Sequence, residues 1–245
     1  MTKVIKRIFA ILLILGIFGS IANIFLSTTS VSTKNDEYDF SSVSIACIGD
    51  SITLATQVDK SYPTCLGEAL GTNKVYNYGI SWSTVATVAP CSCHPNGEYS
   101  HYPYVNRYDD IVSSDIIIVM GGINDYGCLV PLGNSDDTSS DTFYGALNTL
   151  IGGLKKTYPD SYIVYMTGFD YYGKGAHNTS GYYWADYNNA IRQTCIKYNI
   201  DCLDIYNKLP FDHSSYTIDG IHPTQEFIED IWVPIVADYI RNNYK

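Results

Sequence analysis

The chain has 245 residues, of which 46% are hydrophobic and 16% are charged, which suits one α/β domain with a sizeable core and is too little for two. Its net charge is -10, and no basic cluster interleaved with aromatic residues offsets that acidity, so a nucleic-acid-binding protein is excluded. Scattered Gly and Pro, together with apolar runs along the whole length, exclude collagen-like, coiled-coil and disordered chains.

The chain opens with three cations in residues 1–7, and an uncharged apolar stretch follows at 8–26. At about 1.5 Å per residue this stretch is long enough to cross a bilayer. Cations before it and none just after it predict a cytoplasmic N-terminus and an extracytoplasmic remainder, in which a linker at 27–40 leads to one domain at 41–245. The stretch is either a transmembrane anchor, which its length favours, or a cleaved signal peptide, which would yield a secreted protein.

Five short apolar runs rich in β-branched residues predict strands at 43–48, 74–78, 115–120, 162–166 and 201–205. Apolar residues at helical spacing predict helices at 142–158, 183–199 and 224–243. The alternation of strands and helices favours a parallel sheet with right-handed crossovers and helices on both faces. In such a sheet, ligand-binding groups gather just beyond the carboxyl ends of the strands.

Polar residues follow three of the predicted strands, and a fourth polar group precedes the last predicted helix. The first strand runs into Gly-Asp-Ser at 49–51, the second into Gly79, and the third into Gly-Gly-Ile-Asn at 121–124. Asp219 and His222 lie in the loop before the last helix. Together these groups supply the parts of an acyl-transfer site: a hydroxyl nucleophile, an imidazole base, a carboxylate that orients the base, and donors for an oxyanion.

Each group also has a simpler explanation. Asp50 and Ser51 could cap a helix, Asn124 and Asp125 could form a turn, and His222 could be an ordinary loop histidine. The occurrence of all four groups at one rim of the sheet favours the catalytic interpretation.

The four groups match, in order, the four sequence blocks of the SGNH (GDSL-type) hydrolases, and the chain from residue 43 to the C-terminal helix resembles that family. The resemblance implies a three-layer α/β/α sandwich with a central parallel sheet, similar to flavodoxin. It also implies the following roles: Ser51 as nucleophile, His222 as general base, Asp219 as its orienting partner, and an oxyanion hole from the backbone N–H groups of Ser51 and Gly79 and the side-chain amide of Asn124. This chemistry needs neither a metal nor an organic cofactor.

Aromatic residues are dense in the segments 82–108 and 169–184. Outside a cell such loops can stack on sugar rings, although packing against the core explains them equally well. We therefore expect a serine esterase that removes acetyl groups from carbohydrate, with Asp50, Trp82 and Tyr126 at the substrate rim. The alternatives are an O-acyltransferase that uses the same acyl-enzyme, a lipase or lysophospholipase, and a glycan-binding protein without turnover.

Seven cysteines in an exported chain suggest disulfides, and the odd number leaves at least one thiol unpaired. Cys47 lies in an apolar strand and is expected to be that thiol. Cys195 and Cys202 are the local pair for which we predict a disulfide, between the end of a helix and the start of the next strand. A zinc site at Cys91 and Cys93 is a weaker interpretation, because one intervening residue is too few for the usual ligand spacing.

Overall fold

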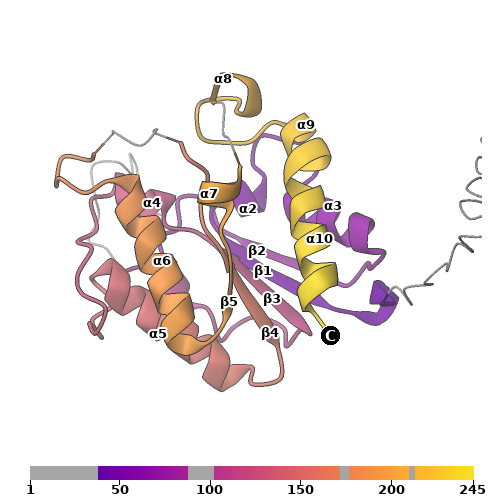
Figure 1. The fold of residues 1–245 in the computed structure, drawn as a ribbon, viewed down its shortest axis with the longest axis horizontal. Coiled ribbons are helices and arrows are strands. Elements are labelled where there is room, and N and C mark those ends of the chain that lie inside the picture. Colours follow the sequence, from indigo (N-terminus) through magenta and orange to yellow (C-terminus); the bar gives the residue numbers. More distant parts are fainter. Residues whose placement is uncertain (1–37, 88–101, 172–176, 210–212) are drawn as a thin grey trace, which may run out of the picture. The chain divides into compact units, whose positions relative to one another are not determined.

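The computed structural model describes residues 38–87, 102–171, 177–209 and 213–245. At its centre is a parallel sheet in the order β2-β1-β3-β4-β5 (Figure 1). The strands are β1 (Ile45–Gly49), β2 (Val75–Gly79), β3 (Ile116–Met120), β4 (Tyr162–Met166) and β5 (Asp201–Leu203). All five predicted strands are present, and the fold is the expected flavodoxin-like α/β sandwich.

Two pairs of helices cover the sheet. Helices α3 (Tyr62–Leu70) and α10 (Val233–Asn243) pack together on one face, and α5 (Phe143–Thr157) and α6 (Trp184–Tyr198) pack together on the other (Figure 1). The connections carry shorter helical segments: η1 (Phe40–Ser42), α2 (Ser51–Leu54), η3 (Tyr104–Asn106), α4 (Ile123–Gly127), α7 (Ile205–Lys208), α8 (His213–Tyr216), α9 (Gln225–Phe227) and the π-helical turn η4 (Ile228–Trp232).

The most buried strands are the ones that lead to the predicted site. Every residue of β1 and β3 is buried, as expected for strands that have a neighbour on both sides and helices on both faces. Strand β2 lies at the edge of the sheet, where its middle residues Tyr76 and Asn77 are exposed. The loops after β1 and β3 are therefore attached to the best-packed part of the molecule.

Two predicted elements differ from the structure. Strand β5 ends at Leu203 because Asp204 caps the start of α7, where its side chain accepts the backbone N–H of Asn207. The single helix predicted at 224–243 is divided into α9, η4 and α10. Pro234, at the start of α10, has no N–H to bond to the preceding turn, which accounts for the wider π-helical turn before it.

The apolar stretch 8–26 and most of the linker 27–40 lie outside the described residues, as do Cys91 and Cys93. In the part of the chain that the structure describes, we find no helix with the length and apolar character that a membrane crossing requires. The anchor and the export of the domain remain predictions from the sequence.

Candidate active site

Ser51 begins helix α2 directly after strand β1. The preceding residue, Asp50, is buried and its carboxylate accepts the backbone N–H of Ile52 at 2.9 Å, which caps the helix. Gly49 allows this close turn, because a Cβ at that position would lie 1.8 Å from the side-chain oxygen of Thr53. The hydroxyl of Ser51 is thereby fixed at the carboxyl end of β1.

A chain of hydrogen bonds connects Ser51 to the loop before α9. Nε2 of His222 lies 2.9 Å from Oγ of Ser51, and Nδ1 of the same ring lies 2.7 Å from Oδ2 of Asp219. The other carboxylate oxygen of Asp219 accepts the backbone N–H groups of Ile221 and His222 at 3.0 and 2.8 Å. Gly220, with φ of +91°, allows the loop to turn back in this way. The structure thus brings together three residues that the sequence analysis placed in one site.

Gln57 is a further member of this cluster that the sequence analysis missed. Its side-chain amide donates to Oδ2 of Asp219 at 2.9 Å and lies 3.1 Å from Nδ1 of His222. Burial raises the pKa of Asp219, but the hydrogen bonds from His222, Gln57 and the N–H of Ile221 outweigh burial and hold the pKa below its usual range. Asp219 is therefore ionised at neutral pH and able to accept a hydrogen bond from Nδ1–H of the imidazole ring.

Asn124 lies in the first turn of α4, after Gly122, whose φ of +117° permits the turn from β3. Its side-chain amide donates to the backbone carbonyl of Ser83 at 3.0 Å. Ser83 closes a turn after β2 by donating its N–H to the carbonyl of Ile80 at 3.1 Å. The loops after β2 and β3 therefore meet at the rim where β1 delivers Ser51.

Gly79 takes part in this arrangement differently from what was expected. Its N–H donates to the side-chain oxygen of Asn77 at 2.8 Å, so an oxyanion role would require that bond to break. The absence of a side chain serves packing instead, because a Cβ on Gly79 would lie 2.2 Å from the backbone nitrogen of Leu54 in α2. In the same loop Trp82 adopts a φ of 63°, which is uncommon for a bulky residue and marks a constrained turn.

Of the three residues predicted at the substrate rim, Trp82 is exposed and the other two are buried. Asp50 is 2% exposed because its carboxylate turns inward to cap α2, and burial raises its pKa to about 6 despite the N–H of Ile52. Tyr126 is 5% exposed, since its ring packs against Trp184 and Tyr187 of α6. Neither Asp50 nor Tyr126 belongs to the rim.

Asp125, next to Asn124, is a completely buried carboxylate. It accepts the backbone N–H groups of Val85 and Ala86, each at 2.9 Å. Burial raises its pKa to about 7, against the effect of these two hydrogen bonds. Asn124 and Asp125 together fasten the segment after β2 to the start of α4.

A family model described as GDSL-like lipase/acylhydrolase matches residues 47–227, from β1 to α9. The chain belongs to this family. The protein is accordingly a carboxylic ester hydrolase, and the matched range contains every residue of the hydrogen-bonded cluster described above.

Solved structures have folds similar to that of this GDSL-like hydrolase. No curated protein matches its sequence. A structural-genomics protein from Lactobacillus plantarum is 27% identical, with a TM-score of 0.71 over 83% of this chain and 98% of that one. A possible lipase from Chitinophaga pinensis is 20% identical, with a TM-score of 0.62 over 82% and 98%. A mutant of an acetyl-xylooligosaccharide esterase from Geobacillus is 18% identical, with a TM-score of 0.57 over 84% and 96%. The last two share the fold of this hydrolase.

Two small cavities adjoin the cluster of the GDSL-like hydrolase. One, of about 10 Å³, is lined by Ser51, His222 and apolar neighbours that include Ile228. A second of similar size lies between Asp50 and Trp184. Each has room for about one water molecule.

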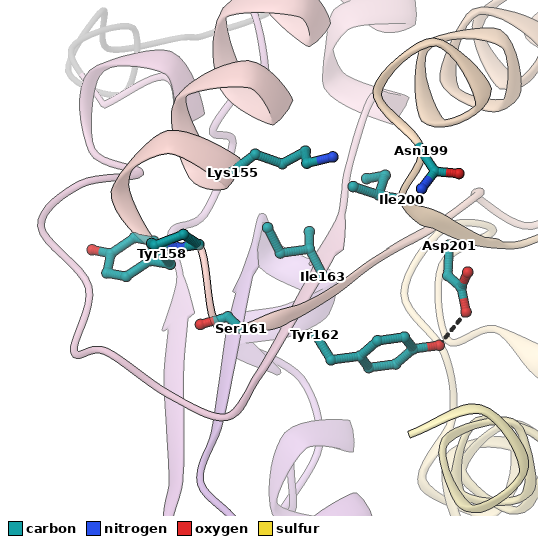
Figure 2. A pocket seen from close by; sticks show the side chains of 9 residues that line it. Lys155, Tyr158, Ser161, Tyr162, Ile163, Asn199, Ile200 and Asp201 are labelled. Atoms are coloured by element: carbon teal, nitrogen blue, oxygen red, sulfur yellow. Dashed lines mark hydrogen bonds between the residues drawn. The ribbon is translucent and has the colours of Figure 1, made fainter. Parts of the chain in front are cut away.

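A cavity of about 160 Å³ lies away from this cluster, next to the start of β4 and β5 (Figure 2). Lys155, Tyr162 and Asp201 line it, and the hydroxyl of Tyr162 is hydrogen-bonded to Asp201. The cavity lies at the amino ends of these parallel strands, whereas Ser51 lies beyond the carboxyl ends of the strands. This cavity is therefore separate from the candidate active site.

The cysteine expectations have different outcomes. Cys47 is a buried free thiol, and burial raises its pKa to about 12. Cys195 and Cys202 are adjacent as expected, but they are free thiols that share a hydrogen bond instead of a disulfide. That hydrogen bond and burial together raise the pKa of Cys195.

Proposed function

We propose that this hydrolase cleaves esters through an acyl-enzyme formed on Ser51. His222 takes the serine proton through Nε2 as the hydroxyl attacks the carbonyl carbon, and it returns that proton to the departing alcohol. Asp219 accepts from Nδ1, holds the ring in the reactive tautomer and stabilises the imidazolium. A water molecule, activated in the same way, then releases the acid. The observation that carries this proposal is the continuous chain of contacts from Ser51 through His222 to Asp219, at 2.9 and 2.7 Å.

The proposed oxyanion donors are the backbone N–H of Ser51 and the side-chain amide of Asn124. One hydrogen of the Asn124 amide is engaged by the carbonyl of Ser83 and orients the group, and the second is available for the substrate. Because the donors are in place before charge develops, each contributes about 3 to 4 kcal/mol to lowering the barrier.

The direct test uses a serine-directed fluorophosphonate and p-nitrophenyl acetate. The parental protein should be labelled at Ser51 and should hydrolyse the acetate ester, and Ser51→Ala should lose both properties while its melting temperature stays near the parental value. Labelling at another serine, or turnover by the purified variant, would contradict the mechanism.

We further propose that the natural esters are short acyl groups, acetyl above all, on carbohydrate. The cavity lined by Ser51 is about 10 Å³, which favours a short acyl group over a long one, and the exposed ring of Trp82 lies in the turn that contacts Asn124. One structural neighbour is an acetyl-xylooligosaccharide esterase, which agrees with this choice.

A screen of acetylated polysaccharides, with acetate release as the readout, tests the substrate class. Trp82→Ala should raise the KM for the preferred oligosaccharide and leave p-nitrophenyl acetate hydrolysis nearly unchanged. Tyr76→Ala is the matched control, because Tyr76 is also an exposed aromatic residue but lies within the edge strand. Equal effects of the two substitutions would count against a sugar contact at Trp82, and preference for long-chain lipid esters would contradict the substrate class.

We infer an extracytoplasmic location from the cation-flanked apolar stretch at 8–26. Protease added to intact cells should remove the catalytic domain. Protection from the protease, with activity in the cytosolic fraction, would contradict this location, and the mature N-terminus would distinguish an anchor from a cleaved signal peptide.

A further inference from the structure

Arg107 extends a largely buried guanidinium into the space behind the active-site loops. It donates four hydrogen bonds to neutral acceptors: from Nη1 to the carbonyl of Tyr78 at 2.7 Å, from Nη2 to the carbonyl of Gly49 at 2.9 Å and to Oγ of Ser83 at 3.3 Å, and from Nε to the carbonyl of Tyr102 at 3.1 Å. None of the four acceptors carries a charge.

Such a cation is costly to bury, because none of its hydrogen bonds is made to a carboxylate. Burial lowers the pKa of Arg107 from its usual value. Two nearby groups offset the cost in part: the ring of Tyr104, whose centroid lies 4.8 Å from the guanidinium carbon, and the buried carboxylate of Asp50. The desolvation penalty of this buried cation indicates a role beyond filling space in the core.

The acceptors of Arg107 belong to the segments that form the candidate site. Gly49 ends β1, two residues before Ser51, and Tyr78 lies in β2. Ser83 is contacted from both sides, since its hydroxyl accepts from Arg107 and its backbone carbonyl accepts from the amide of Asn124. Arg107 therefore touches both the strand that carries the nucleophile and the turn that orients the proposed oxyanion donor.

We propose that Arg107 is a positioning residue that sets the spacing between Ser51 and the turn at Ser83, and through Ser83 the orientation of the Asn124 amide. The inference rests on the proposed function of Ser51 and Asn124. The planar fork of a guanidinium reaches acceptors on three segments at once, which the compact ammonium of lysine does not. Correct spacing matters most when the oxyanion forms, so loss of Arg107 lowers kcat more than it raises KM.

Arg107→Ala tests this with Arg192→Ala as the matched control. Arg192 is also partly buried, and its guanidinium donates to Asp204 at 2.9 Å and lies 5.9 Å from the ring of Tyr206. Its partner Asp204 directly follows β5, which two strands separate from β1, so Arg192 is remote from Ser51. We expect Arg107→Ala to lower kcat for p-nitrophenyl acetate on the order of 10²-fold with a small change in KM. Arg192→Ala should lower the melting temperature and leave kcat within about twofold of the parental value.

Guanidinium chloride at sub-denaturing concentration supplies the readout that a purely structural role would not give. It should restore much of the kcat of Arg107→Ala, leaving the kcat of Arg192→Ala unchanged. If Arg107→Ala does not fold, Arg107→Lys serves instead, because it keeps the stem and the charge but lacks the fork, and its kcat should fall about tenfold.

A folded Arg107→Lys with parental kcat, an equal loss in Arg192→Ala, or a change confined to KM would each overturn the proposal. Measurements on the parental enzyme distinguish failure of the role proposed for Arg107 from failure of the proposed function. If it is labelled at Ser51 and active while the Arg107 variants match the control, only the role of Arg107 is refuted. If it hydrolyses no ester, the proposed function and the role of Arg107 are both refuted.

Discussion

Replacing Asp219 by asparagine should be more damaging than replacing it by alanine. Oδ1 of Asp219 accepts two backbone N–H groups, those of Ile221 and His222. In Asp219→Asn the amide oxygen occupies that place, because the NH2 group cannot face two donors. The NH2 group is then directed at Nδ1 of His222, which must become an acceptor, and Nε2 carries the proton and cannot take one from Ser51.

In Asp219→Ala the ring of His222 loses its carboxylate partner, but no group forces it into the wrong tautomer. The lost hydrogen bond to a charged partner is worth about 1.5 to 3 kcal/mol, or roughly 10- to 150-fold in rate. Gln57, already 3.1 Å from Nδ1, can rotate its amide and present oxygen to the ring. We therefore expect a loss of about 10- to 100-fold for Asp219→Ala, and of about 10⁴-fold for Asp219→Asn.

Steady-state hydrolysis of p-nitrophenyl acetate measures both losses, and thermal melts show whether each variant is folded. The double variant Asp219→Ala with Gln57→Ala should fall well below Asp219→Ala alone, whereas Gln57→Ala by itself should have a small effect. Asparagine equal to or better than alanine at position 219 would refute the assignment of the two carboxylate oxygens. Strict additivity of the Gln57 and Asp219 effects would refute the substitution of one acceptor by the other.

Three further predictions concern the remaining groups of the site. Ser51→Ala and His222→Ala should reduce kcat to the same floor, with no further loss in the double variant, and a lower rate for the double variant would contradict a shared step. Asn124→Ala should lower kcat about 10²- to 10³-fold with little change in KM, and an effect on KM alone would make it a substrate-binding residue. The pKa of Asp125 is raised to about 7, so the folded state binds the extra proton and stability should fall by about 4 kcal/mol as pH rises from about 4 to about 7. Melting temperatures across that range should show the slope, Asp125→Asn should reduce it to the part that Asp50 contributes, and an unchanged slope in that variant would contradict the assignment.

The sheet and the hydrogen-bonded cluster could be predicted from the sequence because short sequence patterns indicate both of them. Continuous apolar runs mark the buried strands, and Ser51, Asp219 and His222 stand directly after a strand or before a helix. Asp50 and Tyr126 were misplaced because neighbours in sequence can point to opposite sides of a turn. Only the packing of α2 and α4 shows that these two side chains face inward.

The supporting residues could not be predicted, because their contacts span the chain. Gln57 reaches Asp219 across 162 positions, and Arg107 reaches Gly49 across 58. Neither side chain belongs to a motif with a fixed spacing, and each would pass as an ordinary surface residue. The left-handed backbone of Trp82 could not be predicted either, because nothing in the neighbouring residues indicates it.

Ser51 and His222, which exchange a proton in the proposed mechanism, lie 171 positions apart, one after the first strand and the other just before the final helices. A chain still emerging from the ribosome therefore exposes its serine long before its histidine exists, and such a chain has no base to activate the hydroxyl. Under the proposed mechanism, catalytic competence is acquired only when the loop that carries His222 closes against the first strand. During refolding, recovery of turnover should accordingly lag behind recovery of the sheet, because the closure of so long a loop is entropically slow. Under this mechanism, ester hydrolysis reports that the whole domain has folded.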